Sequence, residues 1–250
     1  MPTNAPAVLI AHGFTGSQHE LRGLAEYLEE RGVEVRLPLL PGHGTTPDDL
    51  RRYGPDDWLA TLRDEYGALR ERTDRVALVG LSLGGSLALK LASQVQPASL
   101  VVIGAPVRLH YHTAIKAALP LLRLAVGPDM VKPDTGFLAN EVIPGYEQRC
   151  YNRVPIATFQ AMMRFLEREM TAPTLRRVTT PALVIQGSND PIVAPYSVPR
   201  LRAHLGSARK DFVTWNDPFH LIVQGERKRE LYKLIADWLR AASPTSAPTV

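Results

Sequence analysis

The chain has 250 residues, of which 45% are hydrophobic and 22% are charged, and its formal net charge is +4. This composition is that of a compact globular protein and excludes a disordered or fibrous chain, and the scattered basic residues argue against nucleic acid as a partner. The single cysteine, Cys150, excludes an intrachain disulfide. The apolar run at 7–11 is too short for a signal peptide, and the stretch 114–126 is too short and too charged for a membrane span. We therefore expect a cytoplasmic protein without integral membrane association.

Six short runs rich in Val, Ile and Leu are bounded by turn residues and are predicted to be strands. They are 7–14, 33–40, 75–82, 99–106, 181–188 and 210–216. The first five lack polar alternation, which is typical of parallel strands buried on both faces. Segments with helical periodicity lie between them, at 18–31, 56–72, 83–94, 198–205 and 226–241. This alternation predicts one α/β fold, with a mostly parallel sheet and helices on both faces.

The alternation breaks after Pro106, where about 70 residues precede the next strand, far more than a strand-to-helix connection needs. Helix-like pieces at 111–126 and 155–170 flank a stretch rich in Pro and Gly at 127–145. The sequence therefore predicts a discontinuous core, a small helical cap and a flexible tail. Their boundaries are 1–107 with 176–242 for the core, 108–175 for the cap and 243–250 for the tail.

The segment Gly80-Leu81-Ser82-Leu83-Gly84 matches the G-x-S-x-G pattern. The pattern alone is weak and could be a glycine-rich turn with an incidental serine. Here, however, it ends an apolar strand and begins a helical segment, which is the setting of a nucleophile elbow. We expect Ser82 to be a nucleophile, with the two glycines leaving room for a tight turn.

The other two members of a serine triad follow the nucleophile in the order acid, then histidine. Asp190 follows the predicted strand 181–188, and His220 follows the last one, so both are expected at the carboxyl ends of parallel strands. Asp190 could instead only form an Asn-Asp-Pro turn, and Asp217 is the reserve acid. His12 is an alternative base, although a histidine at the end of a first strand more often braces a loop.

The loop His12-Gly13-Phe14-Thr15-Gly16-Ser17 occupies the place from which this arrangement draws an oxyanion donor. We expect the backbone N–H groups of Phe14 and Leu83 to form the oxyanion hole. The histidines lack the spacing of a zinc site, and the chemistry of a serine triad requires neither a metal nor a cofactor.

Motifs at 12–17, 42–44, 80–85 and 186–190 together make the chain resemble bacterial carboxylesterases and monoacylglycerol lipases of the α/β-hydrolase superfamily, over about residues 7–240. The resemblance implies an α/β-hydrolase fold that lacks the first two strands, leaving six or seven. It also implies a small-molecule substrate, a short- to medium-chain carboxylic ester or a monoacylglycerol.

Two positions depart from this resemblance. Phe219 stands where relatives usually have a small or polar residue, and Gln224 stands where Asp is frequent. The departures favour a general carboxylesterase, working through an acyl-enzyme intermediate, over a strict monoacylglycerol lipase. Phe219, Leu119, Leu122 and Met163 are the candidate substrate-binding residues, although apolar cap residues could equally serve only to bury the cap.

Other readings remain open. The same triad serves acyl thioesterases and C–C bond hydrolases, because the fold does not select among acyl-transfer reactions. From a different class, the chain could be a ligand-binding protein without catalysis, built on the same scaffold. The sequence leaves the oligomeric state open.

Overall fold

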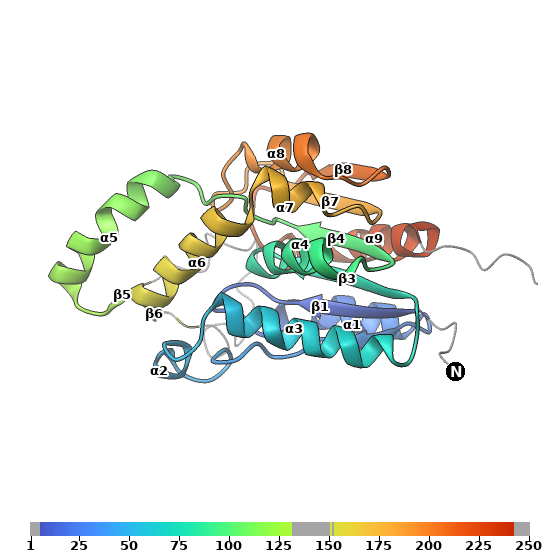
Figure 1. Ribbon diagram of the computed structural model, residues 1–250, viewed down its shortest axis with the longest axis horizontal. Helices are drawn as coiled ribbons and strands as arrows, with labels where there is room; N and C mark the ends of the chain where they lie inside the picture. Colours follow the sequence, from blue (N-terminus) through green and yellow to red (C-terminus); the bar gives the residue numbers. More distant parts are fainter. Residues whose placement is uncertain (1–5, 132–150, 152, 243–250) are drawn as a thin grey trace, which may run out of the picture.

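The computed structural model describes residues 6–131, 151 and 153–242. Its centre is a parallel sheet of six strands in the order β2-β1-β3-β4-β7-β8 (Figure 1). The strands are β1 (Ala7–Ala11), β2 (Glu34–Arg36), β3 (Val76–Leu81), β4 (Ser99–Ile103), β7 (Ala182–Gly187) and β8 (Lys210–Trp215). The predicted parallel α/β sheet of six or seven strands is therefore confirmed, with six.

Helices cover both faces of the sheet, as predicted. One face carries α1 (Arg22–Glu29) and α9 (Lys228–Ala242), and the other carries α3 (Pro55–Arg70), α4 (Leu83–Val95), α7 (Ala172–Arg176) and α8 (Ser197–His204). Successive side chains of a strand point to opposite faces. In β3, Leu78 accordingly packs in the core on the α4 side, whereas Val79 packs with Leu24 and Leu231 on the other side.

Several elements are shorter than predicted. The second strand covers three residues instead of eight, because it lies at the sheet edge and is followed by Pro38 and Pro41, which cannot donate backbone hydrogen bonds. The first predicted helix begins as a separate 3₁₀ turn, η1 (Gln18–Glu20). A short helix that was not predicted, α2 (Pro47–Leu50), is capped by the Thr46 side chain, which accepts from the Asp49 N–H.

The segment after β4 extends beyond the carboxyl ends of the strands (Figure 1). It contains α5 (His112–Val126), β5 (Asp129–Val131), β6 (Arg153–Pro155) and α6 (Ile156–Glu169), and an ion pair of 2.8 Å between Lys116 Nζ and Glu167 Oε1 joins its two helices. The antiparallel pair of β5 and β6 was not predicted. The division into core and cap stays a prediction, and the predicted tail at 243–250 lies outside the described residues.

Within the described part of the chain, no helix is long and apolar enough to cross a membrane. No cluster of three or more His, Cys, Asp or Glu side chains that could hold a metal ion occurs in those same residues.

Candidate active site

Ser82 lies in the sharp turn between β3 and α4. Its φ of 53° is positive, a conformation that costs a residue with a side chain about 1–3 kcal/mol and that recurs at functional sites. The turn depends on its glycines: a Cβ on Gly80 would lie 2.4 Å from the Gly84 carbonyl oxygen, and one on Gly84 would lie 2.2 Å from the Ala11 oxygen. Glycine at both positions therefore lets the backbone close the turn.

The structure brings Ser82, His220 and Asp190 together from the ends of three strands. His220 Nε2 lies 2.8 Å from Ser82 Oγ, and His220 Nδ1 lies 2.7 Å from Asp190 Oδ2. The histidine side chain is 5% exposed and that of the aspartate is 3% exposed. Three side chains separated by up to 138 positions in the sequence thus form one continuous series of hydrogen bonds. Because the histidine and the aspartate are buried, little water reaches this series.

Four hydrogen-bond donors surround the Asp190 carboxylate. Oδ2 accepts from His220 and from Gln186 Nε2 at 2.8 Å, while Oδ1 accepts from the N–H groups of Ile192 and Val193 at 2.8 and 3.1 Å. Burial alone would raise the pKa of Asp190, but the charge and hydrogen bond of His220 and the two backbone donors outweigh it and hold this pKa below its ordinary value. Because an ionised carboxylate only accepts, His220 Nδ1 carries the proton and Nε2 presents its lone pair to Ser82.

The two predicted oxyanion donors lie beside the serine. Phe14 and Leu83 both line the cavity onto which Ser82 opens, and a Cβ on Gly13 would lie 3.6 Å from Ser82 Cβ. Leu83 is the first residue of α4, whose N–H has no partner within the helix. Among the described residues, neither N–H has a hydrogen-bond acceptor. Both are thus open to an incoming oxygen atom.

His12, the alternative base, does not contact the triad. It is completely buried, and it accepts from the Leu40 N–H at Nε2 while Nδ1 lies 3.0 Å from the Gly13 oxygen. Burial lowers the pKa of His12 to about 4, although the Gly13 hydrogen bond opposes the shift. A neutral ring held on both sides braces the loop and has no free nitrogen for proton transfer.

Asp217, the reserve acid, shapes the loop before His220. Its Oδ1 accepts from the Phe219 N–H at 3.0 Å, and its backbone oxygen accepts from Ser188 N–H at 3.0 Å. The structure places Asp190, and not Asp217, on His220.

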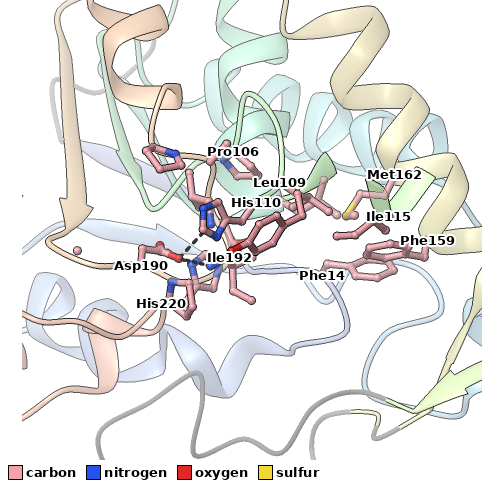
Figure 2. A pocket seen from close by; sticks show the side chains of 18 of the residues that line it. Phe14, Pro106, Leu109, His110, Ile115, Phe159, Met162, Asp190, Ile192 and His220 are labelled. Atoms are coloured by element: carbon pink, nitrogen blue, oxygen red, sulfur yellow. Dashed lines mark hydrogen bonds and ion pairs between the residues drawn. The ribbon is translucent and has the colours of Figure 1, made fainter. Parts of the chain in front are cut away.

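A cavity of about 1170 Å³ opens from the triad. Figure 2 shows Asp190 and His220 at one end and Phe14, Phe159 and Met162 toward the other. Its wall is mostly apolar and includes side chains from two helices of the segment after β4: Ile115, Leu119 and Leu122 from α5, and Phe159 and Met162 from α6.

Two of the four candidate substrate-binding residues line this cavity, namely Leu119 and Leu122. Met163 and Phe219 do not belong to its wall. Met163 packs in the protein core, because one residue along a helix turns the side chain by about 100°, which puts the preceding Met162 on the wall instead. Phe219 is half-buried in the loop that Asp217 shapes.

The wall also contains residues outside the four predicted substrate-binding positions. Phe159 and Met162 are three apart on α6 and so share one face, a signal that the sequence contained. His110 and Tyr111, whose ring centroids lie 4.4 Å apart, precede the first residue of α5 and contribute polar groups to the wall. Met130 comes from β5, a strand of three residues that carried no recognisable pattern.

Comparisons with known proteins agree with this geometry. Residues 8–234 match the alpha/beta hydrolase family. A thermostable monoacylglycerol lipase from Bacillus sp. (strain H-257) is 32% identical over 226 residues, which cover 87% of this chain and 84% of that protein. A carboxylesterase from Bacillus subtilis (strain 168) is 41% identical over 104 residues, or 41% of this chain and 42% of the relative.

Solved structures show the same likeness in three dimensions. One from a study of the metagenome-derived lipolytic enzymes LipS and LipT has a TM-score of 0.84 and 27% identity, covering 96% of this chain and 95% of that one. The monoacylglycerol lipase of Paleococcus ferrophilus has a TM-score of 0.81 over 96% and 97% of the two chains, and at 20% identity it supports the fold alone.

Proposed function

The chain belongs to the alpha/beta hydrolase family, and on that premise we propose that it is a serine hydrolase of carboxylic esters. The observation that carries the proposal is the unbroken series from Asp190 through His220 to Ser82 at the end of an apolar cavity. The named lipases and esterases among its relatives support the same reaction class.

In the acylation step, Ser82 Oγ attacks the ester carbonyl carbon while its proton passes to His220 Nε2, 2.8 Å away. The carbonyl oxygen becomes an oxyanion, which the N–H groups of Phe14 and Leu83 stabilise, assisted by the positive end of α4. Collapse of this intermediate expels the alcohol, which takes the proton from His220. The acyl group remains as an ester on Ser82.

In the deacylation step, a water molecule attacks the acyl-enzyme and His220 takes its proton in turn. The second tetrahedral intermediate collapses, the proton returns to Ser82 Oγ, and the carboxylic acid leaves. In both steps Asp190 holds the imidazole in the tautomer with Nδ1–H and stabilises the imidazolium by its negative charge.

The cavity wall supports an ester whose acyl chain is apolar, and we propose short- to medium-chain carboxylic esters as substrates. Monoacylglycerols are the second candidate, because the Bacillus relative that covers most of the chain is named a monoacylglycerol lipase. The two positions that differ from related monoacylglycerol lipases do not line this cavity. Phe219 is absent from its wall, and Gln224 donates to the backbone oxygens of His19 and Glu20.

A substrate panel tests the proposal. Purified protein and its Ser82→Ala variant are assayed on p-nitrophenyl esters, monoacylglycerols and acyl thioesters of graded chain length. We expect ester hydrolysis that Ser82→Ala lowers by about a million-fold, as in the comparable subtilisin series. A preference for thioesters would redirect the substrate assignment, and equal activity of the two proteins would refute the serine mechanism. Binding of esters without turnover would favour a ligand-binding protein.

A further inference from the structure

Glu20 is a buried acid that the proposed mechanism does not use. It lies in η1, only 5% exposed, and its Oε2 accepts the backbone N–H of Gly13 at 3.0 Å. A Cβ on Gly16 would lie 2.3 Å from both carboxylate oxygens, so the carboxylate fills space that a glycine leaves. The loop from 12 to 17 is thus folded around this side chain.

The geometry of a peptide bond connects this contact with the oxyanion hole. The Phe14 N–H and the Gly13 carbonyl belong to one planar trans peptide and point in opposite directions. The Gly13 oxygen lies 3.0 Å from His12 Nδ1 and accepts the Gly16 N–H at 3.3 Å. On the other side of the Gly13 Cα, the Glu20 carboxylate accepts the Gly13 N–H. Glycine is the residue with the greatest rotational freedom, so these partners determine where the Phe14 N–H points.

A second contact joins Glu20 to the loop that carries His220. Gln224 lies four residues after His220, in η3 (Ile222–Gln224), and its Nε2 donates to the backbone oxygens of Glu20 and His19 at 2.5 and 3.2 Å. Neither Glu20 nor Gln224 lines the substrate cavity. Neither side chain therefore touches a substrate in this cavity, and the contacts described above are with backbone groups.

We propose that Glu20 is a positioning residue that aims the Phe14 N–H at the oxyanion, and that Gln224 fixes the Glu20 segment against the His220 loop. The inference rests on the proposed serine mechanism. It predicts that loss of the Glu20 carboxylate weakens stabilisation of the oxyanion and leaves binding of the uncharged ester unchanged.

The test compares Glu20→Ala with Glu20→Gln, whose amide oxygen can still accept the Gly13 N–H. Rates are normalised to active sites titrated with a fluorophosphonate, so that misfolded protein does not count. We expect Glu20→Ala to lose about 10- to 100-fold in kcat, less than the 10²–10³ for a deleted donor, with KM within about twofold. Its affinity for a trifluoromethyl ketone, which forms an oxyanion on the serine, should fall by a similar factor.

Glu20→Gln should restore kcat and inhibitor affinity to within a few-fold of the wild type. Glu29→Ala, which removes an exposed carboxylate at the end of α1, is the matched control and should change neither. An unchanged kcat per titrated site in Glu20→Ala, or a loss confined to KM, would overturn the proposal.

Gln224→Met provides a second route if Glu20→Ala does not fold. It should lower kcat and inhibitor affinity together, by about 3- to 10-fold, as a partial loss of the same oxyanion donor. Wild-type values for both would overturn the proposal. Failure of the fluorophosphonate to label wild-type Ser82 would instead refute the serine mechanism itself, which separates the two failures.

Discussion

Replacing Asp190 by Asn exchanges one carboxylate oxygen for an NH₂ group. The hydrogen bond between this carboxylate and His220 Nδ1 sets the tautomer of the imidazole. Both carboxylate oxygens accept from two donors each, so the new amide NH₂ must face donors whichever way it turns. When the NH₂ faces His220, Nδ1 becomes an acceptor and the proton moves to Nε2, which can no longer take the proton of Ser82. The corresponding change in a serine protease lowers kcat about 10⁴-fold, equivalent to about 5 kcal/mol of activation free energy.

The assay is kcat for a p-nitrophenyl ester at pH 8, per site titrated with a fluorophosphonate. Asp217→Asn is the matched control, because Asp217 lies three residues before His220. The amide oxygen of the introduced Asn can still accept the Phe219 N–H. We expect a loss of about 10⁴-fold for Asp190→Asn and less than about tenfold for the control. Activity of Asp190→Asn within tenfold of the wild type, or equal losses in both variants, would refute the assigned role.

Three further predictions concern stability and specificity. Because the pKa of His12 falls from 6.5 in the unfolded chain to about 4 in the fold, the neutral ring contributes fully above pH 6.5 and stability is lost as the pH falls toward 4. Urea unfolding should show about 2 kcal/mol of this loss by pH 5. His12→Gln should flatten that slope, and an identical slope would contradict the assignment. Gly84→Ala, which puts a methyl group against the Ala11 oxygen, should destabilise the protein by more than about 2 kcal/mol in thermal unfolding, and a wild-type midpoint would contradict the geometry. Leu122→Trp should lower kcat/KM for long acyl esters more than for acetate, whereas the same change at the exposed Leu121 should not, and equal effects would place the acyl chain elsewhere.

The sequence predicted the parts of the fold in which burial dominates. Strands such as β3 and β4 are apolar on both faces, and only a parallel sheet covered by helices buries them in that way. The prediction was wrong at the edges: β2 is shorter because Pro38 interrupts backbone pairing, and β5 was missed because its three residues pair only with a partner more than twenty residues later.

In the candidate site, too, some residues could be predicted from the sequence and others could not. Ser82, Asp190 and His220 could be predicted, because each lies at or just after the end of a predicted strand and the three occur in the chain order of a serine triad. The roles proposed for Glu20 and Gln224 could not be predicted from the sequence, since they depend on contacts between segments about 200 residues apart. Met163 illustrates a finer limit, because periodicity locates a helix face only to within one residue.

The residue that an active-site fluorophosphonate modifies decides whether Ser82 is the nucleophile. After labelling of the native protein, peptide mass mapping should find one adduct per chain, on Ser82, and labelling should disappear in Ser82→Ala. Pre-incubation with a saturating p-nitrophenyl ester should slow the labelling. An adduct on any other residue, or labelling that persists in Ser82→Ala, would contradict the proposal that this serine is the nucleophile.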